Sequence, residues 1–177
     1  MQGNKIPALF IGASGFTGKQ VLSKATQNGF VCTCLLRNPG ALGINSPFVK
    51  LEKGDAFELE DLKRVMEGQE LVISTFGTKN FDEGVNDRTR AVENMIAAMK
   101  EKGVKRIIHL AGAGIMNLGD KLMSEMPFYP QNLIAVSKDH WGAYQKLVES
   151  GLDFTVYAVP HIKEGSSGLQ NVVVGEE

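Results

Sequence analysis

The sequence predicts an α/β domain in which one parallel β-sheet is covered by helices on both faces. Short apolar runs alternate along the chain with longer segments whose apolar residues recur every three or four positions, the pattern of strands that alternate with amphipathic helices. The first apolar run leads directly into a glycine cluster, Gly12 to Gly18. The length of 177 residues suits one domain with its own core. We therefore expect a single domain that spans residues 1–177.

The first half of the chain divides into three strands and two helices. We expect strands at 6–11, 31–37 and 49–52 and helices at 16–27 and 60–66. Pro7 is tolerated because it lies at the start of its strand, where a missing N–H donor does little harm. Leu22 and Ala25 belong to the buried face of the first helix, and Gly29 ends it. The second strand is nearly all apolar or small, as expected when both of its faces are covered.

The second half continues the alternation and then departs from it. We expect strands at 71–75, 106–111 and 154–159, helices at 87–102 and 137–149, and a candidate seventh strand at 172–174. The helix at 87–102 is the clearest, because Val92, Met95 and Met99 follow the helical period and Gly103 follows its end. Residues 112–132 read as one long loop, and loops of that length inside a compact domain usually have a function.

Right-handed crossovers between parallel strands would give this chain a Rossmann-like, doubly wound sheet with the order 3-2-1-4-5-6. In such a sheet a ligand crosses the carboxyl ends of the strands at the switch between the first and the fourth. Several loop residues fall at that edge: Gly12 to Gly18, Arg37, Asp55, Gly77, Thr78, Gly112, Pro160 and His161. The binding site is therefore expected there.

The glycine cluster favours a dinucleotide. A strand precedes it and a helix follows it, which is the context that a phosphate-binding turn requires. Glycines permit a sharp turn and a close approach of the backbone, and the first N–H groups of the helix lack partners and carry the positive end of the helix dipole. The expected phosphate contacts are Gly12, Ser14, Gly15, Phe16, Thr17 and Gly18. The alternative is a glycine-rich turn without a ligand.

Arg37 at the end of the second strand favours NADP over NAD. NAD sites usually carry Asp or Glu at this place, to accept a hydrogen bond from the ribose 2′-hydroxyl. Arginine cannot accept one, but it can hold a 2′-phosphate with two hydrogen bonds. The alternative is that Arg37 is a solvated cation at the strand end and that NADH is used equally well.

Composition argues against several other classes of protein. The net charge is -1 and the basic residues are scattered, so neither nucleic acid nor an anionic membrane is an expected partner. No apolar run approaches the roughly 20 residues of a membrane span, and the N-terminus lacks a signal peptide. Cys32 and Cys34 read as buried, reduced thiols of a cytosolic protein. No group of ligands has the spacing of a zinc site, so no metal is expected.

Taken together, these motifs resemble those of the atypical short-chain dehydrogenase/reductases of the NAD(P)H-binding type. The resemblance covers nearly the whole chain. It rests on Gly12 to Gly18, Leu35 to Arg37, Gly54-Asp55, Phe76 to Asn80, Ser150 to Leu152 and Pro160 to Ile162. The glycine motif is shared by many relatives, whereas its combination with Gly-Thr-Lys-Asn and Pro-His-Ile is much more specific.

The resemblance implies a monomeric, cytoplasmic enzyme that passes hydride from NADPH to a flavin, a linear tetrapyrrole or another planar acceptor. Gly12, Gly15, Thr17 and Gly18 would hold the pyrophosphate and Arg37 the 2′-phosphate. Asp55 and Ala56 would lie along the adenine, and Gly77 and Thr78 would back the ribose and nicotinamide. His161 would stand beside the substrate pocket.

The chain departs from the family in two places. Gly112 stands where the family's reductase carries a serine after the fifth strand, which removes a hydroxyl next to the nicotinamide. The family's chains also continue past the point where this one ends, so Glu177 is either a natural short end or a truncation. A short end of either kind would leave the substrate side more open.

Few residues are candidates for proton transfer. None of the three tyrosines is followed by lysine four positions later, so the Tyr-x-x-x-Lys chemistry of common alcohol dehydrogenases is not expected. His161 is the best candidate for a general acid, with a packed loop histidine as the equal alternative. His140 and Lys138 face either the pocket or, as we expect, solvent at a helix start, and His109 is expected in the core or at an edge. Trp141 and three methionines, Met116, Met123 and Met126, could form a flat pocket or simply pack.

Two functions from different classes follow. The first is an NADPH-dependent reductase of flavins or similar planar acceptors, for which the cofactor supplies the hydride and the protein supplies position. The second is a non-catalytic sensor that binds NADP(H) and changes shape or partner, which Gly112 and the early end at Glu177 favour and Pro160-His161 opposes. An epimerase or isoflavone-reductase-like enzyme is a weaker third, because the chain lacks room for the usual substrate domain.

Overall fold

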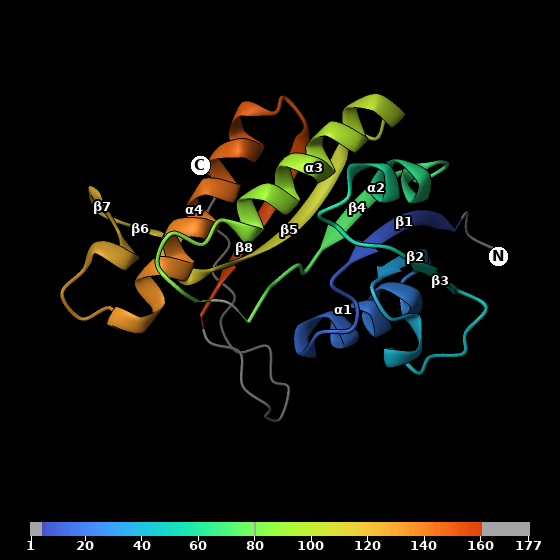
Figure 1. Ribbon diagram of the computed structural model, residues 1–177, viewed down its shortest axis with the longest axis horizontal. Coiled ribbons are helices and arrows are strands. Elements are labelled where there is room, and N and C mark those ends of the chain that lie inside the picture. Colours follow the sequence, from blue (N-terminus) through green and yellow to red (C-terminus); the bar gives the residue numbers. More distant parts are fainter. Residues whose placement is uncertain (1–4, 80, 161–177) are drawn as a thin grey trace.

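Six parallel strands form the central sheet of the protein. The computed structural model describes residues 5–79 and 81–160, and within them the strand order is β3-β2-β1-β4-β5-β8 (Figure 1). The strands are β1 (Ile6–Ile11), β2 (Phe30–Leu36), β3 (Val49–Lys53), β4 (Leu71–Ser74), β5 (Arg106–Gly112) and β8 (Asp153–Val159). Because β8 is the sixth strand of this sheet along the chain, the doubly wound order predicted from the sequence is confirmed.

Helices cover both faces of the sheet. They are α1 (Phe16–Gln27), α2 (Leu59–Met66), α3 (Asp87–Lys102) and α4 (Ile134–Glu149). Residues of α2, α3 and α4 pack in one core cluster, and α1 packs in a second on the opposite face (Figure 1). Successive side chains of a strand point to opposite faces, so Leu9 and Ile11 enter the first cluster and Ala8 and Phe10 the second. Each face thus has its own hydrophobic cluster.

The carboxyl ends of the strands meet at one edge. β1 pairs with β2 on one side and with β4 on the other, which makes the gap between β1 and β4 the switch point of the sheet. Two backbone bonds tie the loops together there: the N–H of Thr75 donates to the carbonyl of Ile11 at 2.9 Å, and the N–H of Gly54 donates to that of Leu36 at 3.0 Å. The loops expected to bind a ligand therefore leave the sheet side by side.

The segment between β5 and β8 differs from the prediction. The expected long loop is built from 3₁₀ turns at 113–115, 123–125 and 131–133 and from a small hairpin, β6 (Asn117–Leu118) and β7 (Lys121–Leu122). Gly119 has φ +65° and permits the hairpin turn. The last 3₁₀ turn runs straight into α4, so this helix begins at Ile134, three residues before the predicted start. His161 and the run at 172–174 lie outside the described residues.

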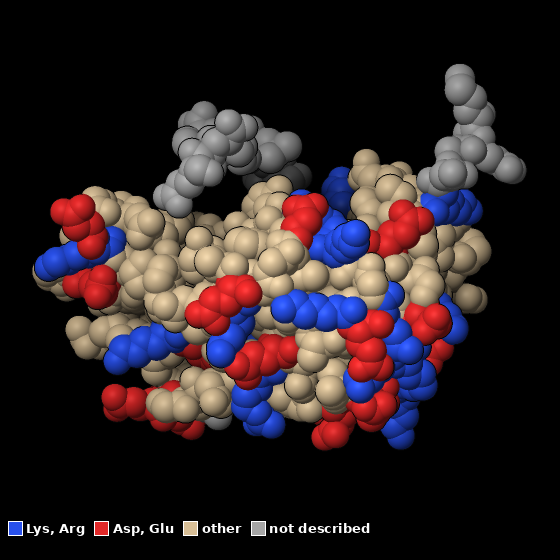
Figure 2. Space-filling model, turned by 90° about the horizontal axis from the view of Figure 1, so that it is seen from above, with Lys and Arg blue, Asp and Glu red and all other residues tan. Residues whose placement is uncertain are grey.

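Charges of both signs cover the side of the molecule formed by α2, α3 and α4 (Figure 2). Several are paired across neighbouring helices, for example Lys63 with Glu101 at 2.8 Å and Lys146 with Glu93 at 3.0 Å. No helix in the described part of the chain is long and apolar enough to span a bilayer. Cys32 and Cys34 are free and buried, as predicted, and burial raises their thiol pKa values to about 11 and about 12.

Candidate functional site

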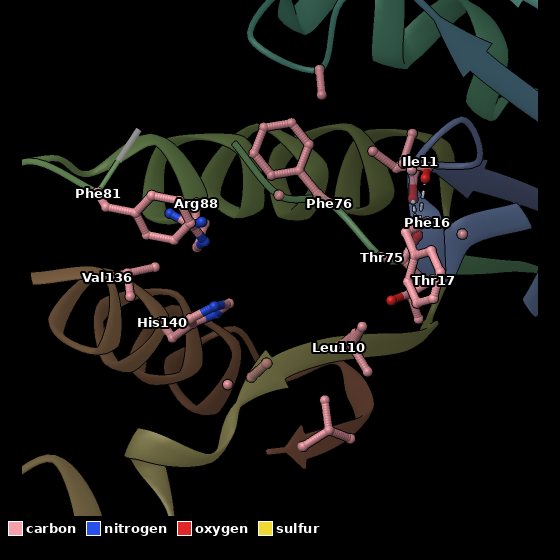
Figure 3. Close-up of a pocket in the computed structure, with 18 of the residues that line it drawn as sticks. Ile11, Phe16, Thr17, Thr75, Phe76, Phe81, Arg88, Leu110, Val136 and His140 are labelled. Atoms are coloured by element: carbon pink, nitrogen blue, oxygen red, sulfur yellow. Dashed lines mark hydrogen bonds between the residues drawn. The ribbon is translucent and has the colours of Figure 1, made fainter. Parts of the chain in front are cut away.

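A cavity of about 940 Å³ runs across the carboxyl ends of the strands (Figure 3). It has two ends. The glycine-loop end comprises Gly12, residues 14–18, Arg37, Asp55 and Ala56, and the α4 end comprises Arg88, Gly112, Tyr129, Ser137 and His140. Every cofactor contact expected from the sequence lines this cavity except Thr78. The volume lies within the range of small-molecule sites, which reaches about 1,000 Å³.

The glycine loop is shaped by contacts between backbones. Gly12 has φ +86°, and a Cβ there would lie 2.6 Å from the carbonyl carbon of Thr75. A Cβ on Gly18 would overlap the carbonyl oxygen of Gly12. The Thr75 hydroxyl also donates to that oxygen at 3.2 Å. Only glycine permits β1, β4 and α1 to approach so closely, so these two positions are fixed by the fold itself.

The start of α1 suits a pyrophosphate. Gly15 is the N-cap and no side chain caps the helix among the described residues. The N–H groups of the first turn therefore have no partner within the helix and lie at the cavity with the positive end of the helix dipole. Ser14 and Thr17 add hydroxyls to the lining. Backbone and hydroxyl donors around a cradle that a Cβ would fill are the donor set that a dinucleotide phosphate requires.

Arg37 follows the last residue of β2 at the same end of the cavity. Its side chain is exposed and forms no ion pair or hydrogen bond within residues 5–79 and 81–160. The neighbouring Asp55 works partly as a turn residue: its carboxylate accepts the Phe57 N–H at 3.1 Å, and its own N–H donates to Asp61 at 3.0 Å. The guanidinium of Arg37 is therefore available to an anionic ligand.

Gly77 and Thr78 have different places. Gly77 lines the cavity, and a Cβ there would meet nothing within 4 Å, so the fold does not require glycine at this position. Thr78 lies outside the lining. Its carbonyl oxygen accepts a hydrogen bond from Arg88 Nη2 at 3.1 Å. The β4–α3 loop is thus held at Thr78 by the first turn of α3.

A buried ion pair joins α3 to α4 at the α4 end. Arg88 and Asp139 are each 3% exposed, with Nη1 and Oδ2 3.2 Å apart. Asp139 also accepts the N–H groups of Arg88 and Thr89, both at 2.9 Å, and the Thr89 hydroxyl at 2.9 Å. A side chain of α4 therefore caps the N-terminus of α3. Sequence reasoning missed this pair, although opposite charges on the apolar stripes of two helices were a visible signal.

His140 corrects an expectation. The sequence analysis favoured a solvent face for both His140 and Lys138. Residues two apart on a helix point to nearly opposite sides, so Lys138 is exposed and His140 lines the cavity (Figure 3). Burial, aided by the charge of Arg88, lowers its pKa to about 3, so the imidazole is neutral. Its Nδ1 atom is buried without a partner in the described structure. A Cβ on Gly112 would lie 3.2 Å from Cδ2 and 3.5 Å from Nε2 of this ring.

Tyr129 and Ser137 form a second polar group at the α4 end that the sequence did not reveal. Their oxygen atoms are 2.7 Å apart, and the Ser137 hydroxyl donates to the carbonyl of Leu133 at 2.8 Å. Since Ser137 has one proton and uses it there, the Tyr129 hydroxyl is the donor between the two. A Cβ on Gly114 would lie 2.6 Å from the Tyr129 oxygen and would overlap Ser137 Oγ. Gly114 thus makes room for this pair.

Of the remaining candidate histidine, tryptophan and methionines in the described part of the chain, all but Met123 lie outside the cavity lining. His109 is buried in β5, as predicted, with Nδ1 3.1 Å from the Ser74 hydroxyl, and burial lowers its pKa to about 4. Met123 lines the cavity, whereas Trp141, Met116 and Met126 do not. Trp141 instead stacks at a tilt on Tyr144, with ring centroids 5.3 Å apart. Of the two alternatives for these four residues, a shared flat pocket is therefore not formed.

Known proteins share this fold. A putative epimerase from Bacteroides thetaiotaomicron superposes with a TM-score of 0.76 at 24% identity, over 88% of this chain and 71% of that one. A putative NADH-flavin reductase from Streptococcus pneumoniae superposes with a TM-score of 0.73 at 21% identity, over 85% of this chain and 70% of that one. At such identities the likeness shows the fold alone.

Sequence comparison identifies the family. Dihydroflavonol 4-reductase from Hordeum vulgare is 27% identical over 148 residues, which cover 75% of this chain and 41% of that enzyme, so the chain spans about two-fifths of this relative's length. The family model for NAD(P)H-binding proteins matches residues 12–177, beginning at the first glycine of the loop. With nearly the whole chain matched, the protein belongs to the NAD(P)H-binding family.

Proposed function

We propose that the protein is an NADPH-dependent reductase of flavins, linear tetrapyrroles or similar planar acceptors. The motifs described above resemble those of flavin reductase (NADPH), also called biliverdin-IXβ reductase, and this resemblance supports the proposal. Bound NADPH would supply the hydride. We further propose a monomeric, cytoplasmic enzyme, in line with that resemblance.

The two ends of the cavity support a division of labour. Gly12, Gly15, Thr17 and Gly18 would hold the pyrophosphate, Arg37 the 2′-phosphate, and Asp55 with Ala56 the adenine. A dinucleotide that starts there and crosses the switch point reaches Gly77 and Gly112 at the carboxyl ends of β4 and β5. The acceptor would then occupy the α4 end.

One observation favours a planar acceptor: the outer part of the cavity presents exposed aromatic rings. Phe81 is 50% exposed and Phe128 is 67% exposed, and both line the cavity. Large exposed apolar side chains around a pocket indicate a binding surface, and aromatic rings stack well on flat conjugated ligands. Phe76 lies deeper, edge-on to Phe57 at 5.7 Å between ring centroids. An open, aromatic mouth suits a loosely held flavin or tetrapyrrole.

A second candidate is a sensor that binds NADP(H) without turnover. Gly112 favours it, because the chain lacks the serine hydroxyl that the family's reductase has at this place. The sensor predicts tight NADPH binding and no NADPH oxidation when FMN, lumiflavin and biliverdin are offered in turn. Turnover with any of these acceptors would exclude it.

The experiment for the cofactor half of the proposal is Arg37→Ala, with NADPH and NADH affinities measured by fluorescence titration. Loss of charge-assisted hydrogen bonds to the 2′-phosphate, worth about 1.5–3 kcal/mol, should weaken NADPH binding roughly 10- to 100-fold. NADH binding should stay within about twofold, because NADH lacks that phosphate. Lys53→Ala, an exposed cation at the end of β3, is the matched control. Equal loss of both cofactors in Arg37→Ala would disprove the 2′-phosphate role.

A further inference from the structure

The α4 end contains several hydrogen-bond donors, and most of them are already committed. Arg88 donates from Nη1 to Asp139 and from Nη2 to the Thr78 carbonyl, whereas its Nε is buried and has no partner among the described residues. The hydroxyl protons of Ser137 and Tyr129 are used in the chain that ends at the Leu133 carbonyl. His140 is the polar side chain of this group whose ring has no partner among the described residues.

The ring of His140 is oriented by its surroundings. Nδ1 faces the protein interior, whereas Nε2 lies by Gly112, at the carboxyl end of β5 on the cavity. A neutral imidazole carries its proton on one nitrogen only. In the tautomer that leaves the lone pair on the enclosed Nδ1, the proton is on Nε2. The N–H then points to the cavity.

Gly112 makes this arrangement possible. A Cβ at 3.2 Å from Cδ2 is tighter than an ordinary carbon–carbon contact, so any larger residue would push the imidazole away from the strand end. Glycine at position 112 therefore removes a hydroxyl but leaves space for the imidazole of His140 at the same edge of the sheet.

We propose that His140 Nε2 is the hydrogen-bond donor to a carbonyl oxygen of the acceptor, and that the acceptor is a planar compound whose carbonyl is conjugated to the atom that becomes reduced. This inference rests on the proposed reductase function. Reduction of such a compound moves electron density onto its conjugated oxygen, and a fixed N–H donor stabilises that oxygen more strongly as the charge develops. The proton that completes the reduction comes from solvent water.

The test separates acceptor binding from cofactor binding. FMN and lumiflavin are titrated by fluorescence quenching into protein saturated with NADP⁺, which binds without reducing them. In His140→Ala the dissociation constant for both flavins should rise about tenfold, the loss of one hydrogen bond, while NADP⁺ affinity stays within about twofold. kcat/KM for flavin reduction by NADPH should fall further, about 100-fold, since the missing bond strengthens in the transition state.

Three further variants sharpen the assignment. His140→Gln retains an N–H donor and should restore most of the flavin affinity. Gly112→Ala keeps the histidine but displaces its ring, and should lose several-fold in flavin affinity. Lys138→Ala, exposed on the same helix and outside the cavity lining, is the control and should match the wild type.

Each outcome is decisive. Wild-type flavin affinity and kcat/KM in His140→Ala would overturn the inference and leave the reductase function intact. Parallel loss of NADP⁺ and flavin binding in both His140 variants would also overturn it, because the residue would then be structural. A wild-type protein that binds NADPH but neither binds nor reduces any planar acceptor would instead refute the proposed function.

Discussion

The two ends of the cavity are built in different ways. The glycine-loop end comes mostly from one continuous stretch, residues 12–18, whose glycines permit its turn and its close approach to Thr75. The α4 end is assembled from α3, β5, the 3₁₀ turns and α4, and it is held by a buried ion pair and by side-chain hydrogen bonds. A mostly local motif therefore shapes the proposed cofactor end, and long-range packing shapes the proposed acceptor end.

The largest expected effect tests the long-range end. Asp139→Ala leaves the Arg88 guanidinium buried without its carboxylate and removes the cap of α3. Breaking a buried pair costs about 3–5 kcal/mol, and loss of a cap adds about 1, so unfolding free energy should fall by about 5 kcal/mol. The unfolding free energy is measured by urea unfolding of Asp139→Ala and of a control variant, Asp153→Ala. Asp153→Ala, which removes an exposed partner of Arg106, should cost at most about 1 kcal/mol. Similar losses in the two variants would contradict the assigned importance of Asp139.

The same contrast explains what the sequence could reveal. The strand order and the glycine loop were predictable, because apolar periodicity and glycine spacing are local signals. The direction of His140 was not predicted, because the start of α4 is poorly marked when a 3₁₀ turn precedes it. Thr78 lies outside the cavity lining, and its expected cofactor contact stays a prediction. Arg88 and Asp139 lie 51 residues apart, and no local pattern states which charged residue on one helix meets which on another.

The glycine-loop end gives the second effect. Gly12→Ala combines a left-handed backbone, which costs about 1–2 kcal/mol, with overpacking against Thr75, which costs about 1–3. The expected loss is about 3–4 kcal/mol in urea unfolding, with NADPH binding weakened as the loop shifts. Gly29→Ala is the matched control, because φ is +89° there and a Cβ meets nothing within 4 Å. Gly29→Ala should lose only about 1–2 kcal/mol of unfolding free energy, the cost of the left-handed backbone. If Gly12→Ala were no less stable than Gly29→Ala, the close approach of β1 and β4 would not need glycine.

The smallest expected effect is a pH dependence of stability that comes from two buried histidines, one of them at the α4 end. His109 and His140 have folded pKa values lowered to about 4 and about 3, mainly by burial and also by the charge of Arg88, with Asp139 opposing at His140. A lowered folded pKa means that the unfolded chain binds protons first. The contribution of each histidine is therefore complete above an unfolded pKa of about 6.5 and is lost as pH falls below it.

Between pH 7.5 and pH 5, each histidine should lower the free energy of unfolding by about 2 kcal/mol, because one pKa unit corresponds to about 1.36 kcal/mol. Urea unfolding at pH 7.5, 6 and 5 should show this slope in the wild type, and His140→Gln and His109→Gln should each remove about half of it. The carboxylates of Glu52 and Asp61, whose pKa values are lowered by hydrogen bonds, stay ionised throughout this window. A slope unchanged in both variants would mean that neither imidazole is held neutral, and the buried character of the α4 end would have to be abandoned.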